Sequence, residues 1–449
     1  MCSIFITGSA GTGKSHLLSL LIKRLESRNY RVGISASTGV ASIQIGGATL
    51  HKLLGLGLAK DNIDDLVSTM LKRSNLRKYW RSIDFLVIDE ISMLDIEFFS
   101  KISTVISRVR RDPRVFGGIQ LILVGDYMQL PPVSKYEPNP NIKYLFQHPI
   151  WKSLKICTVL LTIPKRYNVG NYDHVVDIAD KAATVLHTGK HIDIIDERHY
   201  SAETDYYFFS ILQSIRYGKI TDEVTAFLDK RKIVPSSRGI VPTILISTNA
   251  EVDEYNDMKL NALDGDLHEY EPKYIESGDP PMTRDQMIKS TLTANPLRLR
   301  VGAQVMLLRN MPDDGLCNGS RGVITGFHSV GPTVKFQNGK ELAIHPHNWE
   351  QVVYNIDDAK KSERGRSTLI HLPLKLAWAC TVHKTQGLSL DSVYLSLSSC
   401  FAPGQVYVAL SRCRDPEHLY IKDWSLSALQ STLPDPDVIS FYQDLLSAK

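Results

Sequence analysis

The sequence predicts an α/β protein with two domains built on parallel sheets and a small β-rich insertion in the second domain. Three observations lead to this class. Short β-branched runs alternate with helical patterns in the first third of the chain, and a second alternating region begins near Thr243. Between residues 321 and 346, short strand-like runs are separated by glycines, which is typical of a small β-barrel. The 449 residues are enough for two to four domains.

In the first domain, strands are expected at residues 4–7, 32–36, 85–88 and 120–124. Each run ends in a polar or glycine-rich turn, and open parallel sheets bind ligands at that edge. In the second domain, strands are expected at residues 243–246, 392–397 and 418–421. The polar stretch 357–366 predicts a surface loop. The expected domain limits are 1–165, with an accessory insertion at about 55–80, then 166–320 and 367–449 around an insertion at 321–366.

The amino-acid composition limits the classes of protein to which this chain can belong. The 43% hydrophobic and 22% charged content is that of an ordinary globular protein. A formal net charge of +4 is compatible with a nucleic-acid partner without requiring one. The six cysteines form no CxxC pair and no zinc-spaced cluster with histidine, so we expect a reducing, intracellular compartment. The apolar runs are too short for a membrane span, and we expect neither a signal peptide nor a membrane partner.

A glycine-rich segment lies between the apolar run 4–6 and a helical pattern that starts at Leu17. It consists of Gly8, Ser9, Ala10, Gly11, Thr12, Gly13, Lys14 and Ser15. Glycines let backbone N–H groups close around a phosphate, and the following helix N-terminus adds its dipole. We therefore expect a nucleotide-binding loop in which Lys14 reaches the β- and γ-phosphates and Ser15 ligates magnesium. The alternative is a glycine-rich turn with a purely conformational role.

Two other strand ends carry polar side chains. The run 85–88 is followed by Asp89 and Glu90. Asp89 is placed to hold magnesium, and Glu90 to orient and deprotonate an attacking water. Gln129 follows the run 120–124 and is placed to sense the γ-phosphate or its attacking water. Taken alone, Gln129 is equally well explained as a turn residue.

These motifs and several later ones resemble the Pif-one family of superfamily-one DNA helicases. The matching segments keep the order of the family and span almost the whole chain: residues 8–15, 36–41, 47–51, 88–94, 116–133, 301–310, 318–327, 377–387 and 404–412. The resemblance implies two RecA-like P-loop domains, with an SH3-like β-barrel inserted in the second. It implies ATP and Mg²⁺ as cofactors, and 5′→3′ movement along single-stranded DNA that unwinds duplexes. Single-stranded and forked DNA are the implied partners of a monomeric motor in replication, recombination, repair or telomere maintenance.

The resemblance also assigns roles to residues of the second domain. Arg412 resembles an arginine finger, whose guanidinium neutralises charge on the transferred phosphoryl group. Gln386 and Gly387 resemble a segment that approaches the phosphates. A second finger is expected before the helical segment 208–218, at Arg198 or Arg166, and Arg198 is preferred because it lies nearer that segment.

DNA contacts are implied at five polar residues: Thr38, His51, Thr381, His383 and Lys384. Their hydroxyl, imidazole and amine groups suit phosphate contacts. Trp378 is the nearest candidate for base stacking, although its apolar surroundings favour a core position. Family members carry a glutamine-bearing, adenine-recognising segment before the first strand. Here Met1 lies only a few residues from that strand, which leaves adenine selectivity open.

Three alternative functions remain. A P-loop kinase or switch that does not unwind DNA leaves the segments 377–387 and 404–412 unexplained. A nucleic-acid-binding module with a degenerate motor conflicts with intact Lys14, Asp89 and Glu90. A RecD- or relaxase-type helicase is disfavoured by the Ile-Ser-Met-Leu sequence that follows Glu90.

Overall fold

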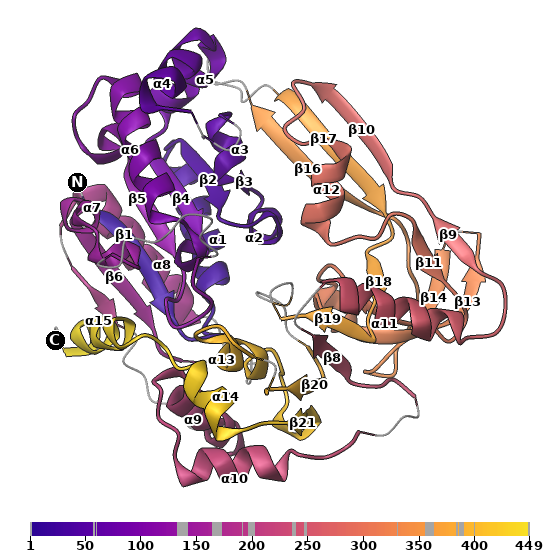
Figure 1. Ribbon diagram of the computed structural model, residues 1–449. Helices are drawn as coiled ribbons and strands as arrows, with labels where there is room; N and C mark the ends of the chain where they lie inside the picture. The colour runs from indigo at the N-terminus through magenta and orange to yellow at the C-terminus, as the bar shows by residue number, and fades with distance from the viewer. Residues whose placement is uncertain are drawn as a thin grey trace. The chain divides into compact units, whose positions relative to one another are not determined.

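The computed structural model describes residues 2–56, 59, 61–132, 142–163, 173–190, 192–195, 203–235, 239–246, 249–329, 331–354, 363–382, 385, 390–398 and 400–447. The chain forms two compact units (Figure 1). The first comprises Met1–Ser201, Val353–Arg364 and Tyr442–Lys449. The second comprises Ala202–Val352 and Gly365–Phe441. The chain therefore leaves the first unit and returns to it twice, at Val353–Arg364 and again at Tyr442–Lys449, after the second unit is complete.

The first unit is built on a seven-stranded sheet with the order β3-β2-β4-β5-β1-β6-β7, and its neighbouring strands are parallel. Its strands are β1 (Ser3–Gly8), β2 (Val32–Ala36), β3 (Ala48–Thr49), β4 (Phe85–Asp89), β5 (Gln120–Val124), β6 (Ile156–Leu161) and β7 (Ile194–Ile195). The four predicted strands are confirmed as β1, β2, β4 and β5. The short edge strands and β6 were not predicted.

The helices of the first unit are α1 (Lys14–Ser27), α2 (Gly39–Gln44), α3 (Leu50–Leu54), α4 (Ile63–Lys72), α5 (Ser74–Ser82), α6 (Ile96–Arg110), α7 (Pro149–Ser153) and α8 (Asp173–Thr188). Helices α1 and α8 pack against each other, and their apolar residues form one core with β1, β4, β5 and β6. The expected accessory insertion at 55–80 contains α4 and most of α5, which both pack on α6. Among the described residues, no helix has the length and hydrophobicity needed to cross a membrane.

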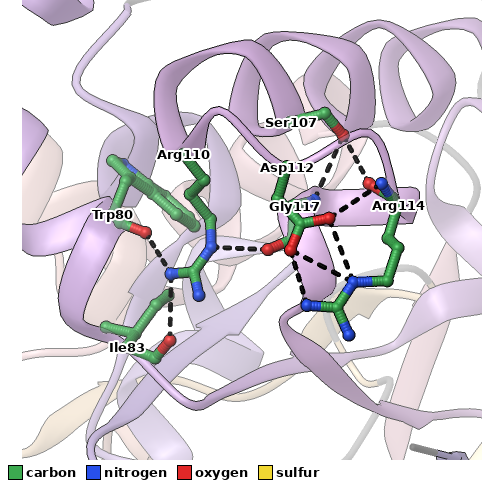
Figure 2. Close-up of polar contacts among 7 residues, drawn as sticks. All are labelled: Trp80, Ile83, Ser107, Arg110, Asp112, Arg114 and Gly117. Carbon is green, nitrogen blue, oxygen red and sulfur yellow. Dashed lines mark hydrogen bonds and ion pairs between the residues drawn. The ribbon is translucent and has the colours of Figure 1, made fainter.

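A tight turn before β5 is anchored from α6 (Figure 2). The guanidinium of Arg110 donates to the carbonyl oxygens of Trp80 at 2.6 Å, Ile83 at 3.2 Å and Gly117 at 2.7 Å. The Ser107 hydroxyl accepts a hydrogen bond from the Gly117 amide at 3.1 Å. One arginine thus ties together the end of α5, the end of α6 and the turn that leads into β5.

The second unit contains a four-stranded parallel sheet with the order β19-β8-β20-β21. These strands are β8 (Thr243–Ile246), β19 (Ala379–Thr381), β20 (Val393–Ser396) and β21 (Leu419–Asp423). The three predicted strands of this domain are confirmed. Helices of this part of the chain are α9 (Glu203–Arg216), α10 (Asp222–Lys230), α11 (Asn249–Asn261), α12 (Arg284–Thr291), α13 (Gln405–Leu410), α14 (Leu426–Ser431) and α15 (Pro436–Ser447), the last of which continues into the first unit.

The β-rich part of the second unit is antiparallel. A five-stranded sheet has the order β15-β14-β13-β12-β18, with β12 (Gln304–Leu307), β13 (Arg321–His328), β14 (Gly331–Phe336), β15 (Glu341–Ala343) and β18 (Leu374–Leu376). Because β12 and β18 flank the predicted insertion in sequence, the insertion pairs with strands outside its limits. Trp378 is buried in the core of this region together with Leu260 and Val305, as the core interpretation expects.

The prediction of a surface loop at 357–366 is wrong for its last residues. Residues 363–366 begin β17 (Glu363–His371), which is antiparallel to β10 (Lys273–Gly278). The sheet continues to β16 (His347–Tyr354), and β9 (His268–Tyr270) pairs separately with β11 (Leu297–Leu299). Polar residues form this strand because it is held by backbone pairing and by an ion pair between Arg366 and Glu350 at 2.6 Å. Residues 357–362 lie outside the described part of the chain.

Candidate active site

The loop between β1 and α1 has a backbone suited to glycine. Three of its residues have positive φ: Gly8 (145°), Gly11 (79°) and Gly13 (94°). A side chain at Gly8 would collide with the carbonyl oxygen of Leu161 in β6. The Lys14 ammonium donates to the carbonyl oxygens of Gly8 at 2.8 Å and Ser9 at 3.0 Å. The loop is therefore closed around its own lysine, in the conformation that close approach to a phosphate requires.

The other residues of the loop differ in exposure. Ser9, Ala10 and Thr12 are buried, and the Thr12 hydroxyl donates to the Ser9 carbonyl at 2.9 Å. Ser15 is exposed in the first turn of α1. The base of the loop is therefore buried, whereas the serine that is predicted to ligate magnesium is exposed.

Asp89 and Glu90 lie at the end of β4. Asp89 is 7% exposed and pairs across the sheet with Ala36 at the end of β2. Burial, followed by the neighbouring Glu90 charge, raises the pKa of the Asp89 carboxyl, and the Lys14 ammonium opposes that rise. Because only β5 separates β4 from β1 in the parallel sheet, the loop and this strand end lie at the same edge of the sheet.

Gln129 lies in the turn after β5. The Gly125 amide at the start of this turn donates to the Ile6 carbonyl of β1 at 3.1 Å. Gln129 is 7% exposed, and its Nε2 donates to the Asp126 carboxyl at 3.3 Å. Since β5 lies between β4 and β1, the turn of Gln129 lies between the acidic pair and the loop. The structure thus brings together the loop residues, Asp89, Glu90 and Gln129 at one edge of the sheet.

The predicted DNA contacts in the first unit already have structural roles. The Thr38 hydroxyl caps α2 by accepting from the Ala41 amide at 3.2 Å. The His51 ring stacks on Phe98, with ring centroids 4.0 Å apart and planes 10° apart. Burial lowers the pKa of His51, although the charge of Asp95 acts in the opposite direction. Both residues follow β2 in the chain: Thr38 is the N-cap of α2, and His51 lies in α3.

In the second unit, Arg412 follows α13 and is 2% exposed. Its guanidinium donates to the carbonyl oxygens of Val408 at 2.9 Å and Thr385 at 3.4 Å, and to the Ser411 hydroxyl at 2.9 Å. Thr381 ends β19 and is 3% exposed, so its hydroxyl is not presented to solvent. The remaining predicted site residues lie outside the described residues: Arg166, Arg198, His383, Lys384, Gln386 and Gly387.

Sequence reasoning missed three buried residues behind the site, which are Thr7, Asp126 and Tyr442. Each is at most 1% exposed, and the Tyr442 hydroxyl contacts the other two. Asp126 carried a signal, because a carboxylate directly after a strand and a glycine is often functional. Tyr442 carried no local signal, because its partners are more than 300 residues away in the chain.

Comparison with known proteins supports one family. The sequence profile of PIF1-like helicases matches residues 2–191, and that of the Pif1 DNA helicase 2B domain matches residues 286–327. ATP-dependent DNA helicase PIF1 of Xenopus laevis is 35% identical over 99% of this chain, which spans 62% of that relative's length.

Solved structures agree with the sequence matches. The Pif1 helicase of Candida albicans is 30% identical, with a TM-score of 0.65 over 100% of this chain and 96% of that one. Pif1 helicase from Bacteroides in complex with ADP-AlF3 and single-stranded DNA is 27% identical, with a TM-score of 0.57 over 100% of this chain and 94% of that one. These matches confirm the predicted family resemblance and the α/β class with parallel sheets.

Proposed function

Because this chain belongs to the PIF1-like helicase family, we propose that it is an ATP-dependent DNA helicase that moves 5′→3′ along single-stranded DNA. The observation that carries the proposal is the convergence of the phosphate loop, the acidic pair and Gln129 at one edge of a parallel sheet. The parallel sheets of the two units are then the cores of two RecA-like domains. The β-rich segment 321–366 is the proposed SH3-like insertion.

The residues at the sheet edge fit a nucleotide with magnesium. The glycine-lined loop offers room for phosphates, and Asp89 is a buried carboxyl whose raised pKa a divalent cation would counteract. Ser15 and Asp89 would hold Mg²⁺, which when bound supplies positive charge to the phosphate oxygens. Lys14 would exchange its loop carbonyl partners for phosphate oxygens.

Hydrolysis requires a base and a group that orients water. Glu90 is the proposed base, because it follows the buried Asp89 at the end of β4, at the same edge of the sheet as the phosphate loop. Gln129 is proposed to orient the attacking water, since Asp126 holds its amide. Arg412 is proposed as an arginine finger, with Arg198 or Arg166 as the second, and Gln386 and Gly387 as phosphate neighbours.

Single-stranded and forked DNA are the proposed partners. The related Bacteroides protein bound to single-stranded DNA supports this assignment. The proposed DNA contacts are Thr38, His51, Thr381, His383 and Lys384. For Thr38 and Thr381, the backbone nearby is the better candidate, because capping and burial occupy their side chains.

The test is strand displacement from duplexes that carry either a 5′ or a 3′ single-stranded tail. We expect ATP-dependent opening of the 5′-tailed duplex and essentially none of the 3′-tailed one, and no opening of either by Glu90→Gln. Phosphate release should also rise strongly when single-stranded DNA is added. Opening of only the 3′-tailed duplex, or equal ATP hydrolysis with and without DNA, would contradict the proposal.

A further inference from the structure

The hydroxyl of Tyr442 lies behind the candidate active site. Tyr442 belongs to α15, is 0% exposed, and is the first residue of the segment that returns to the first unit. Its hydroxyl lies 2.6 Å from the Thr7 hydroxyl, 3.1 Å from the Tyr127 amide and 3.1 Å from an oxygen of the Asp126 carboxyl. Three polar groups from two strand ends therefore meet at one buried oxygen.

The donors and acceptors at this oxygen can be assigned. A phenol has one proton to donate and two lone pairs to accept with. The Tyr127 amide can only donate to it, and the Tyr442 proton goes to the Asp126 carboxyl, so the Thr7 hydroxyl is left as a second donor. Every hydrogen-bonding position of the phenol is used, which packing of an aromatic ring alone does not require.

Asp126 connects the Tyr442 hydroxyl to the side chain of Gln129. One oxygen of its carboxyl accepts from Tyr442 at 3.1 Å and from the Met128 amide at 3.1 Å. The other accepts from the Gln129 side-chain amide at 3.3 Å. Thr7, another partner of the phenol, immediately precedes Gly8, the first residue of the phosphate loop.

We infer that Tyr442 is a positioning residue for nucleotide hydrolysis, whose hydroxyl holds the Gln129 turn in register with the phosphate loop. The inference rests on the proposed ATP hydrolysis. Without the hydroxyl, Asp126 and the Tyr127 amide lose a shared partner, so the carboxyl that accepts from the Gln129 amide is less firmly held. A misplacement of about 1 Å at such a group lowers turnover by about 10²-fold.

The test compares Tyr442→Phe with Tyr30→Phe. Tyr30 is the matched control, because its hydroxyl also forms a hydrogen bond, with His187 at 2.7 Å. It precedes β2 and so lies at the amino end of a strand, whereas the candidate site lies at the carboxyl ends. We expect Tyr442→Phe to lower kcat of DNA-stimulated ATP hydrolysis about 10- to 100-fold with little change in KM, since Gln129 acts on the attacking water. Tyr30→Phe should leave both constants unchanged.

A double variant separates positioning from general destabilisation. In a Gln129→Ala background, Tyr442→Phe should lower kcat by less than about twofold, because the group that it positions is already absent. An unchanged kcat in Tyr442→Phe would overturn the inference. So would a fold-loss of kcat on Tyr442→Phe that is equal in the wild-type and Gln129→Ala backgrounds.

Hydrogen–deuterium exchange without nucleotide tests the geometry independently of catalysis. Peptides that cover residues 125–130 should exchange faster in Tyr442→Phe than in wild type, and remain unchanged in Tyr30→Phe. Unchanged exchange in both variants would overturn the positioning role. Wild-type protein that hydrolyses no ATP would instead contradict the proposed function, while the exchange result would still decide whether Tyr442 holds the turn.

Discussion

Glu90 has a backbone conformation that glutamate seldom adopts. Its φ of 53° and ψ of 47° are left-handed, which costs on the order of 1–3 kcal/mol and persists only where neighbouring contacts determine it. Two such contacts are present, from the Ser37 hydroxyl to the Glu90 carbonyl and from the Glu90 amide to the Asp89 carboxyl, each at 2.8 Å. They set the direction in which the chain presents this carboxylate, as a positioned base requires.

Two substitutions should separate nucleotide binding from hydrolysis. Lys14→Ala should lose both binding and hydrolysis, because it removes the cation that is proposed to bind the phosphates. Glu90→Gln should bind ATP normally yet lose about 10²- to 10⁴-fold in kcat, since an amide cannot accept the proton of water. Fluorescent-nucleotide affinity and DNA-stimulated phosphate release measure the two properties.

The exposed Glu97 supplies the control for the acidic substitution, because Glu97→Gln makes the same chemical change in the first turn of α6. It should hydrolyse ATP at the wild-type rate. Wild-type turnover by Glu90→Gln would remove Glu90 from the mechanism.

At the residue scale, the sequence predicted the position of a side chain best where that side chain belongs to a motif of a few residues. The convergence of the Lys14 loop with Asp89 and Glu90 could be predicted, because both motifs follow short apolar runs that form strands β1 and β4 of one parallel sheet. The state of Thr38 and Thr381 could not, since a motif does not show whether a hydroxyl caps a helix or is buried at a strand end.

At the scale of elements, the turn before β5 has three consecutive residues with positive φ. Phe116, Gly117 and Gly118 have φ of 52°, 61° and 76°, and left-handed phenylalanine is uncommon. The Phe116 ring is fully buried beside Phe99 of α6, with centroids 4.9 Å apart. Burial of this ring and the Arg110 bonds explain a conformation that local propensity does not favour.

Arg110→Ala should therefore destabilise the fold. It leaves carbonyl oxygens of Trp80, Ile83 and Gly117 without the donor shown in Figure 2, which should lower the free energy of unfolding by about 2–3 kcal/mol. Chemical denaturation measures this change. Arg108→Ala, in the same helix, removes an ion pair with the highly exposed Asp64 and should cost less than about 1 kcal/mol. Equal losses in the two variants would contradict the anchoring role.

Strand prediction succeeded for seven strands of the two parallel sheets, but it missed the short strands β3, β7 and β19, and it missed β6 although that strand is largely apolar. It failed at residues 363–366, because β17 is an antiparallel strand whose polar residues are held by pairing with β10. The β-rich insertion was recognisable from its glycines, but its pairing with β12 and β18 depends on long-range contacts that a local pattern does not contain.

For the whole molecule, affinity for single-stranded DNA should depend on salt and little on base sequence. Phosphate contacts release counterions, so the slope of log affinity against log salt should be about −0.7 per neutralised phosphate. Fluorescence anisotropy with a thymine oligonucleotide and a mixed-sequence oligonucleotide of equal length measures both properties. A flat slope, or strong preference for one oligonucleotide, would contradict binding through contacts to the DNA phosphates.

The late return of the chain to the first unit also orders events during synthesis. Thr7 and Asp126 emerge from the ribosome early, but the Tyr442 hydroxyl that joins them follows only after the entire second unit has been made. At about 5–20 residues per second, that interval is on the order of tens of seconds. The unit that carries the phosphate loop is thus completed only after the second unit has been synthesised, so a newborn chain acquires the Tyr442 contacts long after it has made the strands that they join.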